Sequence, residues 1–166
     1  MHRLILLPLL LATSLPKPNV TLDASCTPLI HSSEAKIAQP AWHSVTQTTG
    51  MSLEAMKVDG KFYIQMDGKW MAAPMDLDKA EKIAISQLQN GDIKVSHCEE
   101  EGTETLDGIE MQIFSYTSEI PASGLPATTA KLYIGKTDNL PYKITDGNAQ
   151  ATTVTYRYKD ISAPTL

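Results

Sequence analysis

The chain has 166 residues, of which 42% are hydrophobic and 20% are charged, and its formal net charge is -5. This composition is typical of one globular domain and excludes an intrinsically disordered chain. The acidic balance argues against a nucleic-acid partner, because binding to phosphates normally requires a basic surface. Beyond Arg3, Arg157 is the only arginine, which also argues against bidentate recognition of phosphate.

The first residues have the layout of a secretory signal peptide. Arg3 carries positive charge, residues 4–11 are almost entirely apolar, and small residues follow at 12–14. We expect residues 1–24 to be the signal peptide, with cleavage between 14 and 24, and residues 25–166 to form a single domain. The apolar run is too short to cross a bilayer. The protein is therefore expected to be exported to the periplasm or secreted from a bacterial cell, and not to span the membrane.

Cys26 and Cys98 are the two cysteines of the chain, and we expect them to form a disulfide. An exported protein meets an oxidising compartment, where paired cysteines usually become disulfides. Their wide separation, without C-x-x-C spacing, argues against a thioredoxin-type redox site. Asp23 stands where a lipoprotein signal requires an apolar residue, so lipid attachment to Cys26 is not expected.

A helix is predicted to begin at Thr27-Pro28, because threonine can cap a helix and proline is tolerated in its first turn. Pro40 ends it. From Trp42 the apolar period changes to two, as in a strand. Strands are predicted at 42–49, 51–58, 61–66 and 69–71, with Asp-Gly pairs at 59–60 and 67–68 that favour tight hairpins.

A second helix is predicted from Asp76 to Asn90, where Gly91 supplies a stop. Beyond it the strand period returns at 93–98, 103–106, 109–116, 130–134, 140–145 and 152–158, with Asp-Gly turns at 107–108 and 146–147 and a loop at 118–128. The acidic run 99–101 is predicted to be a solvated turn rather than a calcium site.

Seven to nine strands joined by short turns, with two helices, predict an α+β fold. So many hairpins in sequence order favour an antiparallel meander that is twisted and curved. The concave face of such a sheet must be covered, and the two helices are the candidates to cover it.

No catalytic motif is present, and we predict neither an enzyme nor a bound metal or cofactor. The histidines that remain after the signal peptide, His31, His43 and His97, lack metal-binding spacing. No nucleophile elbow or glycine-rich phosphate loop occurs. Although His97 precedes Cys98, the disulfide would consume the sulfur.

Aromatic and methionine side chains fall almost entirely in the predicted strands. Phe62, Ile64 and Met66 alternate with polar residues and therefore share one face. The simpler interpretation is core packing. If the helices cover this face incompletely, however, an apolar cleft remains that suits a lipid-like ligand. The residues expected to line it are Met56, Phe62, Ile64, Met66, Met111, Ile113, Leu132, Ile134, Val154 and Tyr156.

Five segments together resemble a known family: VDGKFYIQMDGKW, VSHCEEEG, LDGIEMQIFSY, KLYIGKTDNLPYKI and VTYRYKDISAP. With a cysteine near the first helix, this order is similar to the periplasmic LolA-like superfamily, which includes outer-membrane lipoprotein-sorting carriers and mycobacterial lipid-carrying lipoproteins. The resemblance spans residues 26–164. It implies a strongly curved, incomplete antiparallel barrel covered by two helices, with an apolar cavity for acyl chains.

One departure from the sorting carriers bears on function. Those carriers use an arginine in an early strand to control the lid and the transfer of cargo, whereas the cations between residues 42 and 71 here are Lys57, Lys61 and Lys69. The resemblance therefore implies a small periplasmic relative rather than a lipoprotein shuttle. The first hypothesis is a carrier or binding protein for a lipid or other apolar ligand. The alternative is a periplasmic protein-interaction module with a closed core, in which an edge or the loop 118–128 meets a protein partner.

Overall fold

The computed structural model describes residues 22–147 and 151–166. The predicted signal peptide lies outside these ranges except for its last three residues. The elements are η1 (Ala24–Cys26), α1 (Thr27–Ile37), β1 (Ala41–Thr48), β2 (Met51–Val58), β3 (Lys61–Met66), β4 (Lys69–Ala72), α2 (Leu77–Asn90), β5 (Lys94–Leu106), β6 (Ile109–Glu119), η2 (Pro121–Ser123), β7 (Thr128–Gly135), β8 (Pro141–Asp146) and β9 (Thr153–Arg157).

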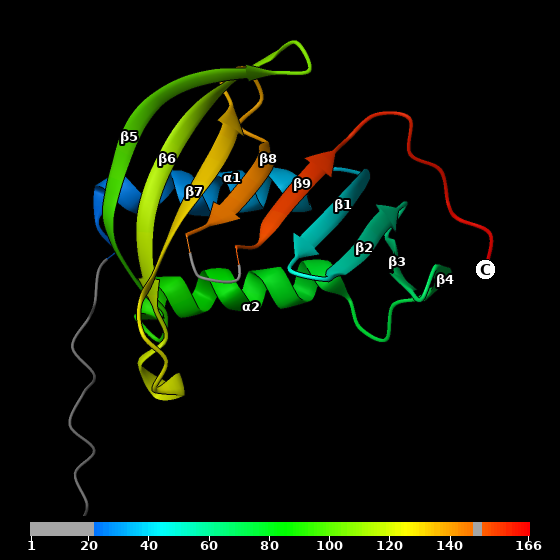
Figure 1. Ribbon diagram of the computed structural model, residues 1–166, viewed down its shortest axis with the longest axis horizontal. Coiled ribbons are helices and arrows are strands. Elements are labelled where there is room, and N and C mark those ends of the chain that lie inside the picture. The colour runs from blue at the N-terminus through cyan, green and yellow to red at the C-terminus, as the bar shows by residue number, and fades with distance from the viewer. Residues whose placement is uncertain (1–21, 148–150) are drawn as a thin grey trace, which may run out of the picture.

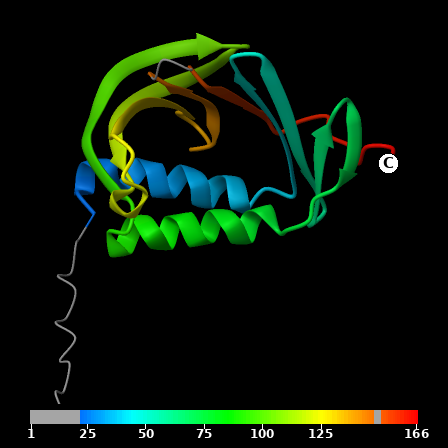
Figure 2. The same cartoon turned by 60° about the horizontal axis from the view of Figure 1, so that its bottom comes forward.

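The nine strands form one antiparallel sheet in the order β4-β3-β2-β1-β9-β8-β7-β6-β5. In Figure 1 α1 lies behind the sheet and α2 runs along its lower side, and Figure 2 shows the sheet arching over both helices. The α+β fold with a strongly curved, unclosed sheet covered by two helices is therefore confirmed. The strand order differs from one continuous meander, because β1 pairs with β9 and so joins two meanders, β1–β4 and β5–β9.

The helix boundaries follow from local chemistry. Pro28 stands in the first turn of α1, as predicted. The Asp76 side chain accepts a hydrogen bond from the Lys79 N–H at 2.9 Å and thereby caps the first turn of α2. Gly91 adopts φ 79° directly after the helix, a left-handed conformation that ends helices and that glycine adopts without a steric penalty.

Three of the four Asp-Gly pairs form the predicted hairpin turns. Asp59 and Gly60 have φ values of 47° and 75°, and the pairs at 67–68 and 107–108 are similar. Positive φ at both central residues is the signature of the type I′ turn, whose twist matches that of the flanking strands. The fourth pair behaves differently. Asp146 ends β8, and the Gly147 N–H donates to the Thr129 carbonyl of β7 at 2.9 Å.

The predicted turn at the acidic run is wrong. Glu99, Glu100 and Glu101 lie inside β5, which continues from Lys94 to Leu106 as one strand. The pairing of β5 with β6 shifts register twice in this region, and His97 has φ 52° just before it. Such bulges bend a strand and increase its twist. The strand therefore curves over the helices without being interrupted.

A disulfide joins Cys26 to Cys98, with 5.2 Å between their Cα atoms, as predicted. Cys26 is fully buried and precedes α1, whereas Cys98 belongs to β5 at the edge of the sheet. The bond therefore fixes the N-terminal end of α1 against one margin of the sheet.

The strand register determines which side chains face the helices. Directly paired residues of antiparallel strands share a face, and neighbours along a strand alternate between faces. Ser44 pairs with Tyr156, and the Tyr156 ring contacts Lys36 of α1, so this pair faces the helices. His43 pairs with Arg157 and also with Met56 on the other side, so these residues lie on the outer, convex face.

The turn between β7 and β8 makes a testable prediction. The Asp138 carboxylate accepts hydrogen bonds from the Leu140 N–H at 3.0 Å and the Tyr142 hydroxyl at 2.7 Å. A Cβ at Gly135 would meet this carboxylate and lie 2.8 Å from the Tyr142 ring. Gly135→Ala should therefore lower the free energy of unfolding by about 1–3 kcal/mol, the usual penalty of overpacking.

Guanidinium denaturation checks this expectation. Gly147→Ala is the matched control, because a Cβ there makes only an ordinary contact of 3.5 Å. Equal losses of stability in the two variants would contradict the role given to the Asp138 turn.

Candidate ligand-binding cavity

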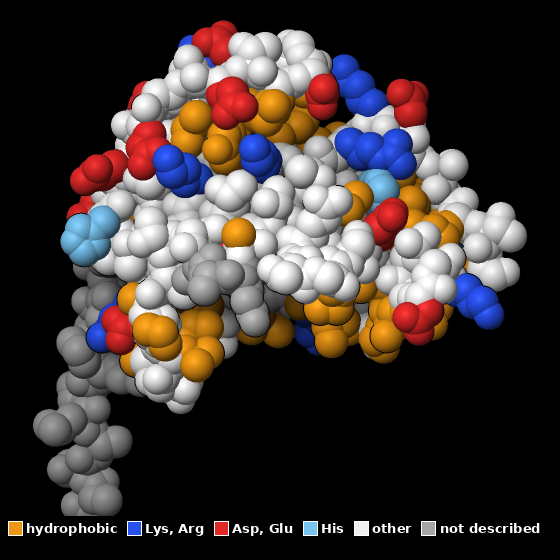
Figure 3. Space-filling view, viewed as in Figure 1, with side chains coloured by type: hydrophobic (Ala, Val, Ile, Leu, Met, Phe, Trp, Pro, Cys, Tyr) orange, Lys and Arg blue, Asp and Glu red, His pale blue; other side chains and the backbone are white. Residues whose placement is uncertain are grey.

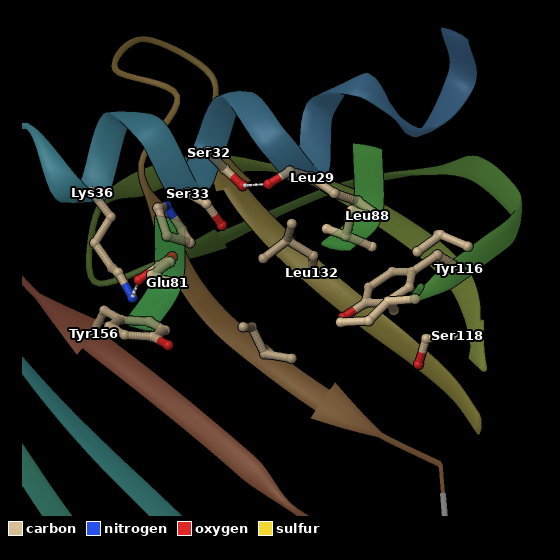
Figure 4. Close-up of a pocket in the computed structure, with 14 residues that line it drawn as sticks. Leu29, Ser32, Ser33, Lys36, Glu81, Leu88, Tyr116, Ser118, Leu132 and Tyr156 are labelled. Carbon is tan, nitrogen blue, oxygen red and sulfur yellow. Dashed lines mark hydrogen bonds and ion pairs between the residues drawn. The ribbon is translucent and has the colours of Figure 1, made fainter. Parts of the chain in front are cut away.

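A cavity of about 230 Å³ lies between the two helices and the concave face of the sheet. Figure 4 shows its walls. They comprise Leu29, Ser32, Ser33 and Lys36 of α1, Glu81 and Leu88 of α2, and Ile93, Val95, Tyr116, Ser118, Leu132, Pro141, Ile144 and Tyr156 from the sheet and the segment before β5.

Apolar side chains from three elements meet in the middle of this cavity. Leu29 comes from α1, Leu88 from α2 and Leu132 from β7, and Figure 4 shows them gathered on the same side of α1. Ile144 pairs with Leu132 across β7 and β8 and continues the apolar wall. These residues form a surface suited to a hydrocarbon chain.

An ion pair closes one end of the cavity. Lys36 of α1 is paired with Glu81 of α2, and both side chains are mostly buried. The Lys36 Nζ also lies 5.2 Å from the ring centroid of Trp42 and 4.9 Å from that of Tyr156. Aromatic faces attract a cation at such distances. Lys36 therefore connects α1 to α2 and to the sheet at the same point.

Two tyrosine hydroxyls add polar character to the cavity. Burial raises the pKa of Tyr116, and the proximity of Tyr156 and Asp146 raises it further. Burial is also the main cause that raises the pKa of Tyr156, with a second contribution from the Glu81 charge. Both hydroxyls therefore remain protonated at neutral pH and are available as hydrogen-bond donors.

A second buried lysine fixes the helices beside the cavity. The Lys57 Nζ of β2 donates to the Ile37 carbonyl at the end of α1 at 2.8 Å and to Asp78 Oδ2 of α2 at 2.6 Å. The side chains of Lys57 and Asp78 are only 8% and 14% exposed. Lys57 is one of the three cations that the sequence offers between residues 42 and 71, and it joins β2 to both helices.

Two further cavities adjoin the first. One of about 270 Å³ shares Ser32 with it and is lined by Ile134 and Phe114. Another of about 500 Å³ shares Leu88, Ile93 and Val95 with the first. The space beneath α1 therefore extends in two directions from the central cavity.

The structure distributes the predicted ligand-binding residues over several places. Leu132 and Tyr156 line the central cavity, and Ile134 lines the adjoining one. Phe62, Ile64, Met66 and Val154 also face the helix side of the sheet by their register, but they lie outside the linings of these three cavities.

Three predicted residues lie on the outer face. Met56 pairs with His43 on the outer face. In β6, Gln112 and Phe114 face α1. Met111 and Ile113 alternate with them and therefore point to the outer face. Met56 and Met111 are buried there. The sequence-based set therefore combines residues from both faces of the sheet, and a role of the three in ligand binding is not part of our proposal.

Several cavity residues were not predicted from the sequence. Leu29, Ser33 and Lys36 recur at positions i, i+4 and i+7, and Glu81 and Leu88 are seven residues apart. This spacing places each group on one face of a helix. The helical spacing was visible in the sequence, but Ser33, Lys36 and Glu81 are polar and do not look like residues of a buried surface.

The outer face carries a polar network that joins three strands. His43 Nε2 donates to Glu54 Oε2 at 2.7 Å, and Arg157 Nε donates to His43 Nδ1 at 2.8 Å. These bonds connect β1 to β2 and to β9. On the face shown in Figure 3, hydrophobic side chains form separate areas, with other side chains, backbone and scattered charged residues between them. We assign the network a role in holding the strands together.

The described residues contain neither a metal-binding cluster nor a helix suited to a membrane. Within residues 22–147 and 151–166, no three His, Cys, Asp or Glu side chains gather as a metal-binding group. In the same ranges no helix has the length and apolar character needed to cross a membrane. The absence of a metal and of an enzymatic activity remain predictions.

No family model and no curated protein sequence matches the chain. Solved structures do match it. The Mycobacterium tuberculosis lipoprotein LppX is 13% identical, with a TM-score of 0.58 over 85% of this chain and 98% of LppX. LprF from Mycobacterium bovis is 13% identical, with a TM-score of 0.52 over 85% of this chain and 96% of LprF. At such low identity these similarities show the fold alone, and the fold is the LolA-like one that the sequence segments resemble.

Proposed function

We propose that the protein is a periplasmic binding or carrier protein for a lipid or another apolar ligand held beneath the two helices. The cavity of about 230 Å³ carries this proposal, because it lies between the helices and the sheet and is lined mainly by apolar side chains with a few polar ones. Ligand sites in proteins commonly have this character. The similarity in fold to LppX and the resemblance to lipid-carrying lipoproteins support it. The proposal involves no catalytic step.

The proposed location rests on two features. The disulfide between Cys26 and Cys98 is typical of an oxidising compartment. The first 24 residues have the layout of a signal peptide, so we propose that the mature domain is 25–166.

The direct test is native mass spectrometry of the protein purified from its own periplasm, followed by extraction with organic solvent. We expect an adduct that extracts as a lipid. A clean unliganded mass, together with no uptake of a fluorescent fatty acid, would contradict the proposal.

A variant that fills the cavity sharpens this test. Ser33 of α1 lines the cavity, whereas its neighbour Glu34 is exposed to solvent. We expect Ser33→Phe to reduce uptake of the fluorescent fatty acid at least about tenfold, because the ring occupies ligand space. Glu34→Phe adds the same ring to the same helix and should leave uptake unchanged. Equal uptake by the two variants would place the ligand elsewhere.

A second candidate function is protein interaction through the loop between β6 and β7. Ile120 and Leu125 of this loop are 50% and 70% exposed. Large apolar side chains exposed on one short loop are a feature of many interaction sites. This function is supported if the purified protein carries no lipid and takes up none, and if Leu125→Ser abolishes capture of a periplasmic partner.

A further inference from the structure

The shape and charge of the cavity narrow the class of ligand. Resting on the proposed function, we infer that the ligand is a single-chain lipid with an uncharged, hydroxyl-bearing head group, such as a monoacylglycerol. Its head lies at the end formed by Ser33, Lys36, Glu81 and Tyr156, and its chain runs between Leu29, Leu88 and Leu132.

The first argument is size. A volume of about 230 Å³ corresponds to roughly eight water molecules at about 30 Å³ each. This is less than the roughly 300–1,000 Å³ usual for drug-sized ligands. We therefore assign the central cavity a single acyl chain, which continues past Leu88, Ile93 and Val95 into the adjoining cavity of about 500 Å³.

The second argument is polarity along the cavity. Figure 4 shows Lys36, Glu81, Ser33 and Tyr156 gathered at one end, with Leu29, Leu88 and Leu132 beyond them. Tyr116 and Ser118 line the opposite end. A ligand that matches the polar end and the apolar middle of the cavity has a polar head joined to an apolar chain.

The third argument is charge. Lys36 and Glu81 are paired and mostly buried, so this end of the cavity carries no net charge. A carboxylate or phosphate head would bring a third charge into a partly desolvated site where, among the described lining residues, the one Lys or Arg is Lys36, which is already paired. Burial of an unpaired charge is costly. An uncharged head avoids this penalty.

The fourth argument is hydrogen bonding. Among the described residues, the hydroxyls of Ser33 and Tyr156 have no hydrogen-bond partner, and both line the cavity. Each hydroxyl offers one donor and two acceptor positions. A head group with hydroxyls and an ester carbonyl supplies both kinds of partner, whereas a plain hydrocarbon supplies neither.

Calorimetric titration of the delipidated protein with three probes tests the inference. These are 1-monolauroylglycerol, laurate and dilauroyl phosphatidylglycerol. We expect 1-monolauroylglycerol to bind at least about tenfold more tightly than either anionic probe, because a single buried unpaired charge costs that much or more. Tighter binding of laurate or of the two-chain lipid would overturn the inference and leave the proposed function standing. If no probe binds and no lipid is extracted from the native protein, the proposed function itself fails.

Two variants test the assigned position of the head group. Tyr156→Phe keeps the ring beside Lys36 and removes the hydroxyl, so it should weaken binding of 1-monolauroylglycerol about fivefold. Tyr63→Phe makes the same change on the outer face and should have no effect. Equal affinities of these two variants would overturn the assignment.

Glu81→Gln tests the role of the ion pair. It leaves the Lys36 charge unpaired, so it should shift the preference by about tenfold towards laurate. An unchanged preference in the folded variant, as judged by circular dichroism, would overturn the charge argument. If the variant does not fold, the comparison of Tyr156→Phe with Tyr63→Phe still tests the assigned position of the head group.

Discussion

Replacement of Lys57 by methionine should lower the free energy of unfolding by about 3–5 kcal/mol, the usual cost of removing one partner from a buried ion pair. The variant leaves the Asp78 carboxylate buried without its cation and the Ile37 carbonyl without its donor. Asp78 Oδ1 already has no hydrogen-bond partner among the described residues. Guanidinium denaturation followed by circular dichroism measures the loss.

The double variant Lys57→Met, Asp78→Leu is the decisive control. It removes both charges, so it should recover most of the stability that the single variant loses. Lys61→Met changes an exposed lysine at the start of β3 and should alter stability by less than about 0.5 kcal/mol. If Lys57→Met has the same free energy of unfolding as Lys61→Met, Lys57 does not hold the helices.

Removal of the disulfide should have an effect of similar size. The bond joins residues 72 positions apart, and closing a loop of this length contributes about 4 kcal/mol in the chain-entropy model. We expect the variant Cys26→Ala, Cys98→Ala to lose about this much stability in guanidinium denaturation. The native protein treated with a thiol reductant should show the same shift. A midpoint that reductant leaves unchanged, with both thiols shown to be free, would contradict this expectation.

Local features were predictable from the sequence because their causes are local. Asp76 and Gly91 set the ends of α2 through a cap and a left-handed residue, and neither requires knowledge of the rest of the chain. The hairpin at Asp59-Gly60 was predictable for the same reason. The pairing of β1 with β9 brings together residues more than a hundred positions apart. No local pattern encodes this contact, so a single meander was the natural but incorrect expectation.

The assignment of residues to faces could have been sharper. A two-residue turn at Asp59-Gly60 fixes the register of its hairpin, so Lys57 pairs with Phe62 and Met56 with Tyr63. It follows that Met56 and Phe62 lie on opposite faces. Apolar character alone had placed them together. The register argument requires only the turn type, which the sequence supplies.

The polar end of the cavity could not be predicted from the sequence. Lys36 stands in the last turn of α1, where a cation is favourable for the helix dipole and is usually exposed to solvent. Its partner Glu81 belongs to the other helix. Only the placement of α1 against α2 and the sheet shows that the two charges meet in a buried site.

The acidic residues of β5 have a consequence for solubility. A long strand at the edge of a sheet offers unpaired backbone groups to the edge of another molecule, which is a common route to aggregation. Here β5 is the longer of the two edge strands, β4 being the other, and it carries Glu99, Glu100 and Glu101 in succession together with two shifts of register. A second copy aligned along this edge would bring its own glutamates against them and would meet a strand too irregular to pair with. The long edge of the unclosed sheet thus contains its own protection against edge-to-edge aggregation.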